Sequence, residues 1–119
     1  MKGGRAAYQN GLAAEEIAAG LYRREGGRVL AERWRCPEGE IDLIVELTGV
    51  VVFVEVKARR TRDAAAGAVS PAQWRRLGAA AERWLAEEAT GVPDCRFDVV
   101  LVDGAGATER VENAHSFDT

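Results

Sequence analysis

The chain has 119 residues, of which 47% are apolar and 29% are charged, and this composition is typical of a globular protein and excludes a disordered one. The net charge of −3 excludes a protein whose overall basic field attracts nucleic acid, although a local basic patch remains compatible with it. The longest apolar run is far too short to span a membrane, and we expect no secretory signal at the N-terminus. Cys36 and Cys95 lack metal-ligand spacing, so we expect reduced thiols in a cytoplasmic protein.

Apolar residues recur at helical spacing from about Asn10 to Glu25, which predicts an amphipathic helix. Asn10 is a suitable N-cap and Gly26-Gly27 a stop signal, while residues 1–9 are expected to be loose. The expected apolar stripe consists of Ala14, Ile17, Ala18, Leu21 and Tyr22.

Two glutamates occupy this helix, and helical phase separates them. At about 100° per residue, Glu15 lies on the flank of the apolar stripe and Glu16 lies nearly opposite it. Glu15 is therefore the glutamate that can reach a sheet, although a solvated helix glutamate is the simpler interpretation of either residue.

A first strand is predicted over Arg28–Arg35, and a β-hairpin within residues 39–60, where Val- and Ile-rich runs flank Leu47-Thr48-Gly49. Asp42, Glu55 and Lys57 interrupt these apolar runs. Glu55 and Lys57 share one face of their strand, because side chains alternate along a strand. If the hairpin pairs Asp42 with Glu55, two carboxylates and an ammonium converge on one patch.

A second helix is predicted to start at Ser70-Pro71 and to end before Thr90-Gly91, because Ser70 is a good N-cap and Pro71 suits the first helical position. Strands follow at about residues 95–102 and, at a sheet edge, 107–111, and residues 112–119 are expected to be loose. The order α-β-β-β-α-β predicts an α/β or α+β sheet with helices on both faces. We expect a single domain over residues 1–119 with its core at about residues 10–103.

The carboxylates Asp42 and Glu55 have the chemistry of a site for a hard divalent cation such as Mg²⁺, with the backbone carbonyl of Val56 as a further oxygen ligand. Such an ion lowers the pKa of bound water and stabilises charge on a phosphate, and Lys57 adds a point charge. These residues predict a metal-dependent phosphodiesterase site. The alternative is a structural salt bridge between Asp42 and Lys57, with Glu55 as a second partner.

The motifs Gly39-Glu40-Ile41-Asp42 and Phe53-Val54-Glu55-Val56-Lys57, joined by a hairpin, resemble those of the PD-(D/E)xK nuclease superfamily. More closely, the chain resembles the UPF0102 (YraN-like) family, which is related to archaeal Holliday junction resolvases. The resemblance extends from about Gly11 to Val102 and includes the leading helix and the strand Arg96-Phe97-Asp98-Val99-Val100. It implies a restriction-endonuclease-like α/β fold: a mixed sheet flanked by helices in the order α-β-β-β-α-β.

The resemblance also implies roles for single residues. Asp42 and Glu55 match metal ligands, Lys57 matches the catalytic lysine, and Glu15 matches the helix glutamate that completes the metal site of resolvases. Gln73 matches a position that carries Lys or Gln and that could contact the phosphate. The cofactor implied is one or two Mg²⁺ or Mn²⁺ ions, and the partner is DNA, with branched DNA and a homodimer suggested by the resolvases. Residues 63–67 lack the aromatic-Gly pair that relatives often carry, which leaves open how this loop contacts DNA.

Several arginines flank the predicted cleft and are candidates for phosphate contacts, with a solvated charged surface as an equally weighted alternative. These candidates are Arg59, Arg60, Arg62 and Arg76. Asp98 is expected to make a structural hydrogen bond to a neighbouring turn. His115 is expected to have no catalytic role, and Trp34, Trp74 and Trp84 are expected in helix–sheet packing.

Three functions remain in competition. The first is a Mg²⁺- or Mn²⁺-dependent endonuclease of the Holliday junction resolvase type. The alternative is a catalytically silent module that keeps the nuclease fold and binds nucleic acid or a protein. A scaffold that uses an exposed sheet edge is the third.

Overall fold

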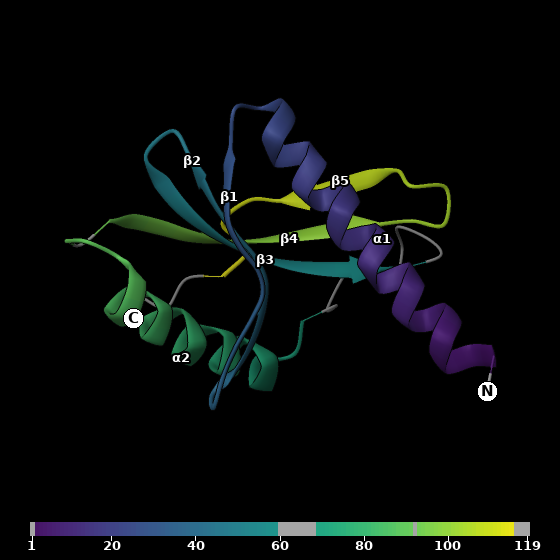
Figure 1. Cartoon of the computed structure of the whole chain (residues 1–119), viewed down its shortest axis with the longest axis horizontal. Coiled ribbons are helices and arrows are strands. Elements are labelled where there is room, and N and C mark those ends of the chain that lie inside the picture. Colours follow the sequence, from purple (N-terminus) through teal and green to yellow (C-terminus); the bar gives the residue numbers. More distant parts are fainter. Residues whose placement is uncertain (1, 60–68, 92, 116–119) are drawn as a thin grey trace.

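The described part of the chain forms a five-stranded mixed sheet with a helix packed on each face (Figure 1). The structure is a computed structural model that describes residues 2–59, 69–91 and 93–115, with the side chains of the first helix described from Leu12 onward. The elements are α1 (Lys2–Arg24), β1 (Arg28–Cys36), β2 (Gly39–Leu47), β3 (Val50–Ala58), α2 (Pro71–Glu88), β4 (Asp94–Val102) and β5 (Thr108–Val111).

The strands lie in the order β1-β2-β3-β4-β5. β3 and β4 pair in parallel, whereas the other neighbouring strands pair antiparallel. This confirms the expected order α-β-β-β-α-β and the restriction-endonuclease-like α/β fold, with β5 as the short edge strand.

The hairpin between β2 and β3 closes through the two residues Thr48 and Gly49, which have φ angles of 48° and 81°. Positive φ at both central positions is the geometry of a type I′ turn, whose twist matches that of the paired strands. The turn sets the register, in which Leu43 lies opposite Val54 and Leu47 opposite Val50.

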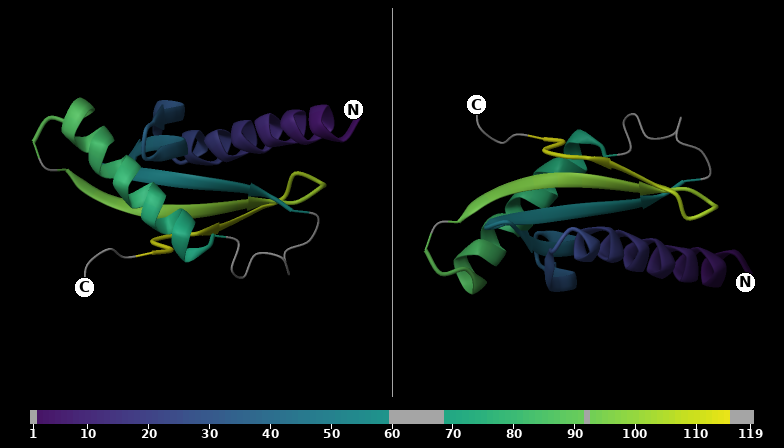
Figure 2. Two further views of the ribbon diagram at one scale, coloured as in Figure 1. Left: turned by 90° about the horizontal axis from the view of Figure 1, so that it is seen from below. Right: turned by 90° about the horizontal axis from the view of Figure 1, so that it is seen from above.

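The two faces of the sheet bury separate cores. Figure 2 shows α1 running along β3 and β4, whereas α2 crosses the strands obliquely. The core under α1 includes Ala18, Tyr22, Leu43, Val52, Val54 and Val100. The core under α2 includes Ile44, Phe53, Leu77, Ala81, Trp84 and Phe97, with Trp34 and Trp74 packed against it. The three tryptophans therefore have the predicted packing role.

The start of α2 is fixed by a capping box. The Ser70 hydroxyl accepts a hydrogen bond from the Gln73 backbone N–H, and the Ser70 backbone N–H donates to Oε1 of Gln73, both at 3.2 Å. Pro71 occupies the first turn, as predicted. Each bond satisfies a backbone group that the helix itself leaves unpaired.

Removing this cap should weaken the protein measurably. We expect Ser70→Ala to lower the free energy of unfolding by about 1 kcal/mol, because the Gln73 N–H loses its acceptor. Urea denaturation followed by circular dichroism measures the change. Ser70→Asp keeps an acceptor at the same place and should stay within a few tenths of a kcal/mol of the wild type. Equal losses in both variants would show that the cap contributes little.

Asp98 is fully buried in the core under α1, and it connects three segments of the chain. It accepts hydrogen bonds from the Tyr22 hydroxyl at 2.7 Å, from Nε of Arg96 at 3.0 Å and from the Asn113 backbone N–H at 3.0 Å. Burial and the hydrogen bond to Asp98 raise the pKa of Tyr22. The predicted structural role of Asp98, with a bond to a neighbouring turn, is confirmed.

Two expectations about the chain ends are corrected. α1 begins at Lys2 rather than near Asn10. Residues 2–9 contain no proline and include good helix formers such as Arg5, Ala6 and Ala7, so the helix extends through them. The part of the tail up to His115 is docked rather than loose: the Ala114 N–H donates to the Phe97 carbonyl at 2.7 Å, and His115 stacks on Trp74. Of the helices described, none is long and apolar enough to cross a bilayer.

Candidate functional site

The candidate site lies where β2 separates from β3. Their pairing ends at Leu43 and Val54, and a regular ladder would next bond Val56 to Ile41. Instead, the Val56 backbone N–H donates to Oδ2 of Asp42 at 2.9 Å. The Asp42 side chain thus replaces the missing backbone partner and is held at the point of separation.

The remainder of the β1–β2 hairpin turns away from β3 and lies along α2 (Figure 1). Ile41 packs in the core under α2, whereas Leu43 packs under α1. Because these two residues would share a face in a regular strand, β2 is irregular at Asp42. A charged side chain is accommodated within an otherwise apolar strand by this irregularity.

The carboxyl groups of Glu55 and Asp42 lie close enough to interact, which is the proximity that pairing of the hairpin was expected to produce. Burial, followed by the hydrogen bond to Asp42 and the negative charge of Asp42, raises the pKa of Glu55, and Lys57 acts in the opposite direction. Two like charges at such proximity favour retention of a proton between them. Asp42, Glu55 and Lys57 therefore do converge on one patch, which sequence alone left conditional.

Glu15 approaches the same patch from α1. Its Oε2 accepts a hydrogen bond from Nε of Arg33 at 2.6 Å, and both side chains are largely buried. Burial raises the pKa of Glu15, the negative charges of Asp42 and Glu40 add to this, and Arg33 opposes it. By contrast, Glu16 is exposed and lies 4.0 Å from Arg23. Of the two glutamates, Glu15 therefore faces the sheet, as the helical phase predicts.

Arg33 is a site residue that sequence reasoning missed. It lies across from Asp42, between the pairs Glu32–Leu43 and Trp34–Ile41, with a left-handed φ of 51°. Such a backbone costs about 1–3 kcal/mol for a residue other than glycine and is found preferentially at functional sites. The sequence carries no signal for the left-handed conformation of this residue.

Glu40 is the second addition to the predicted set. Its charge acts on both Glu15 and Glu55, and its side chain pairs with Arg35 at 3.4 Å. Its half-buried side chain suits a supporting role beside the carboxylates.

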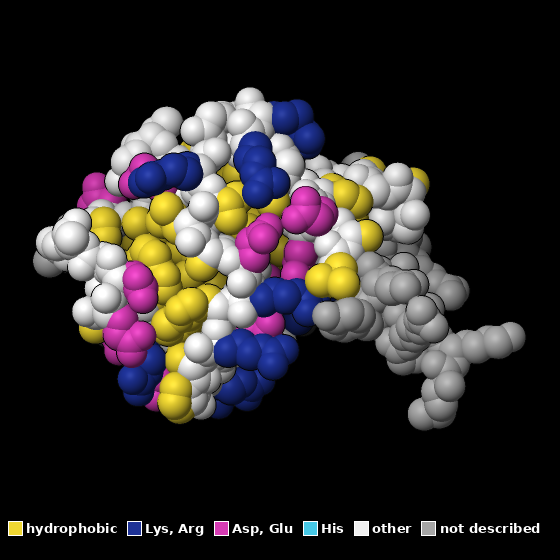
Figure 3. Space-filling model, in the orientation of Figure 1, with side chains coloured by type: hydrophobic (Ala, Val, Ile, Leu, Met, Phe, Trp, Pro, Cys, Tyr) yellow, Lys and Arg dark blue, Asp and Glu magenta, His cyan; other side chains and the backbone are white. Residues whose placement is uncertain are grey.

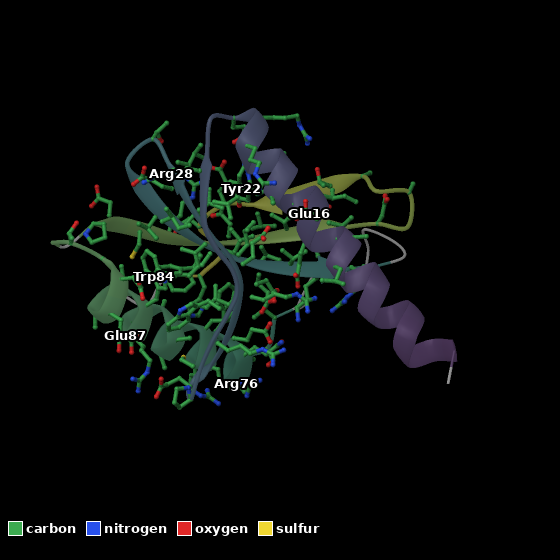
Figure 4. The ribbon with its side chains drawn as sticks, in the orientation of Figure 1. Glu16, Tyr22, Arg28, Arg76, Trp84 and Glu87 are labelled. Atoms are coloured by element: carbon green, nitrogen blue, oxygen red, sulfur yellow. The ribbon has the colours of Figure 1, made fainter. Side chains whose placement is uncertain are left out.

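For the remaining predicted site residues that the structure describes, the contacts lie with other groups than the carboxylates of the site. Oε1 of Gln73 is used in the capping box, which leaves its amide nitrogen as the group able to donate to a phosphate. Arg59 donates to the Ala58 carbonyl at 2.8 Å. Arg76 is exposed on α2 beside Gly39 (Figure 4). Arg60 and Arg62 lie outside the described residues.

The charges form a mixed surface. On the face shown in Figure 3, acidic side chains gather in the middle, between the α1 and α2 layers, and basic side chains lie beside them. A cation or the backbone of a nucleic acid would meet both signs of charge here. This arrangement can position a phosphate only if the acidic groups are neutralised, by protons or by a cation.

The donor set is suited to a hard divalent cation in its chemistry. One or two carboxylates, a carbonyl and water are the usual ligands of Mg²⁺, and Asp42 and Glu55 supply the two carboxylates. In residues 2–59, 69–91 and 93–115, however, no three Asp, Glu, His or Cys side chains are grouped so as to enclose a cation. Glu15 is bonded to Arg33 instead.

Comparison with known proteins places the chain among its relatives. The model of the family described as "Uncharacterised protein family UPF0102" matches residues 14–102. The chain belongs to the UPF0102 family. The matched segment contains the carboxylates Glu15, Asp42 and Glu55, as well as Lys57 and Gln73.

Individual UPF0102 proteins are similar over most of their length. A UPF0102 protein of Roseobacter denitrificans is 47% identical over 114 residues, which cover 95% of this chain and 88% of the relative. One of Bradyrhizobium is 50% identical over 98 residues, covering 82% and 70%. One of Granulibacter bethesdensis is 42% identical over 119 residues, covering 99% and 75%. The family resemblance stated from the motifs is thus confirmed.

Proposed function

We propose that this UPF0102 protein is a metal-dependent endonuclease that hydrolyses phosphodiester bonds of DNA. The observation that carries the proposal is the half-buried carboxyl pair of Asp42 and Glu55, beside Lys57, at the point where β2 leaves β3. Family membership assigns no reaction, so the proposal depends on the chemistry of these side chains.

Asp42 and Glu55 would hold Mg²⁺ or Mn²⁺, with the Val56 carbonyl as a further oxygen and Glu15 as an assisting carboxylate. An ion bound there lowers the pKa of water and neutralises charge on phosphate oxygens. The Val56 N–H bond fixes one oxygen of Asp42, so the other oxygen is free to turn toward Glu55. Prior fixing of ligands is what gives a site affinity without a large ordering cost.

Lys57 and the flanking basic groups would bind the DNA. The Lys57 ammonium acts on Glu55 and would place a positive charge beside the phosphate to be cleaved. The Gln73 amide nitrogen, Arg59 and Arg76 would contact neighbouring phosphates, which position a nucleic acid without reading its sequence.

A second candidate is a DNA-binding module without turnover. The ion pair between Glu15 and Arg33 favours it, because that pair occupies the third carboxylate of the proposed centre. The two candidates share the basic groups and differ in what Asp42 does. Removal of Asp42 abolishes cleavage in the first and leaves DNA binding unaffected in the second.

Cleavage assays test the proposal directly. Linear, single-stranded and four-way-junction DNA are incubated with Mn²⁺ and with wild type, Asp42→Ala or Glu55→Ala. We expect each variant to lose activity by about 100-fold or more. Glu16→Ala removes an exposed carboxylate from the same helix as Glu15 and is expected to retain full activity.

Equal cleavage by wild type and both site variants would refute the assignment. Salt-dependent DNA binding without cleavage, unchanged in Asp42→Ala, would select the binding module. A preference for the four-way junction should be accompanied by a dimer in sedimentation experiments, since a junction offers two symmetric cleavage points.

A further inference from the structure

The backbone of Arg33 is unusual for its place in the fold. Three described residues other than glycine have positive φ. Thr48 and Asn113 lie in turns, whereas Arg33 lies inside β1. Arginine has no intrinsic preference for this conformation, so the surrounding contacts must maintain it. Its side chain is only 27% exposed, which is low for an arginine in an edge strand.

The contact that this conformation makes possible is the bond to Glu15. A 2.6 Å hydrogen bond from a guanidinium to a carboxylate is short and charge-assisted, and it joins β1 to α1. Glu15 also lies within electrostatic reach of Asp42 and Glu40. Arg33 therefore places a positive charge among carboxylates that would otherwise repel one another.

We propose that Arg33 is a positioning residue that holds Glu15 in competition with the divalent cation, so that loading of the metal centre requires Glu15 to leave Arg33. This inference rests on the proposed metal-dependent function and adds a regulation to it. A guanidinium released from Glu15 is a good partner for a DNA phosphate. A phosphate that takes Arg33 should then raise the affinity for the cation, and the cation should raise the affinity for the phosphate by the same factor.

The opposite role is also physically reasonable and gives the opposite sign. A residue that orients a metal ligand strengthens the site, and its removal typically weakens metal binding by about 10- to 100-fold. A guanidinium that competes with the metal ion for Glu15 weakens metal binding, so removal of that guanidinium strengthens metal binding. The direction of the change in Mn²⁺ affinity therefore distinguishes the two roles.

Isothermal titration calorimetry with Mn²⁺ on the full-length protein measures this affinity. Arg33→Asn removes the guanidinium, and asparagine tolerates the left-handed backbone, so the fold should persist. We expect Arg33→Asn to bind Mn²⁺ about 10-fold more tightly than wild type, as expected for the loss of one charged hydrogen bond that competes with the ion. Arg33→Lys keeps the charge and should remain close to wild type.

Two further variants separate competition for Glu15 from a general effect of charge. Arg35→Asn removes an arginine of the same strand, one that pairs with Glu40, and should change the affinity by about 3-fold or less. In a Glu15→Gln background, Arg33→Asn should have no effect, because the ligand for which it competes is gone. Thermal melts of all variants verify that they are folded.

If wild type binds Mn²⁺ in an Asp42-dependent manner and Arg33→Asn binds it equally or more weakly, the competition is refuted while the metal centre stands. If neither wild type nor Arg33→Asn binds Mn²⁺, the metal centre is refuted and the competition with it. Binding by Arg33→Asn alone would support the competition in its strongest form.

Discussion

Glu55→Gln should stabilise the metal-free protein at pH 8 while abolishing its response to Mn²⁺. In the wild type, Glu55 is half-buried beside Asp42, and either the two charges repel each other or a proton must be taken up. A glutamine has nearly the same shape, and its amide can donate to Asp42 as a protonated glutamate would. The substitution removes a cost to the fold that exists only because the side chain can ionise.

The pH dependence gives the sign of this effect. The pKa of Glu55 in the folded protein lies above its ordinary value of 4.5, so above that pH the folded state binds a proton that the unfolded state has lost. Stability then falls as pH rises from about 4.5 toward the folded pKa, by at most about 1.4 kcal/mol per pH unit. Below the unfolded pKa both states carry the proton, so the stability no longer changes with pH through Glu55. The Gln variant should lack this slope, so its advantage should grow between pH 5 and pH 8.

Thermal melts at several pH values, with and without Mn²⁺, measure both effects. Mn²⁺ should raise the melting temperature of wild type, and more so at pH 8 than at pH 5, because the ion displaces the proton. Glu46→Gln, in the same hairpin but paired with Arg28 at 3.2 Å on the surface, should change the unfolding free energy by less than about 1 kcal/mol. A Glu55→Gln variant that is less stable than wild type at pH 8 would mean that the ionised pair supports the fold.

Asp98→Ala should be the most damaging single substitution in the core under α1, with an expected loss of about 3–5 kcal/mol of unfolding free energy. The loss is large because three donors depend on this one carboxylate. The Tyr22 hydroxyl, the Arg96 guanidinium and the Asn113 N–H would all be left without their acceptor. Removing one partner of a buried charged network leaves the others desolvated and unpaired.

Chemical denaturation measures this loss, and Asp103→Ala is its matched control. Asp103 also accepts two backbone hydrogen bonds, from Ala105 and Ala107, but in an exposed turn. Water can replace it there, so we expect a loss of about 1 kcal/mol. Similar losses for Asp98→Ala and Asp103→Ala would show that burial does not amplify the contribution of Asp98.

Most of the architecture was predictable from local sequence signals. Periodicity and caps placed α2 and its buried face, since Ser70-Pro71 marks its start and Leu77, Ala81 and Trp84 are buried as expected. The hairpin was predictable because Thr48-Gly49 between two β-branched runs favours a tight turn. The choice of Glu15 over Glu16 followed from helix geometry alone.

The unpredicted features are those that depend on contacts between distant segments. The separation of β2 from β3 at Asp42 depends on α2, against which Ile41 packs. The bond between Arg33 and Glu15 joins β1 to α1, so local sequence signals do not reveal it. The tail up to His115 docks because Asp98 and Phe97 offer it partners. The capping role of Gln73 is a different case, because the spacing Ser70-x-x-Gln73 is itself a capping-box signal.

The parallel pairing of β3 with β4 has a consequence for the order of folding. The strands β1, β2 and β3 form a meander joined by tight turns, so their pairing closes short loops. β4 can join β3 only after the 35 residues between Ala58 and Asp94 have been closed into a crossover, and longer loops cost more entropy to close. The meander that holds Asp42 and Glu55 should therefore form in the folding transition state before β4 docks. The two carboxylates would then meet while still surrounded by water, and their repulsion would grow only as β4 and the helices enclose them.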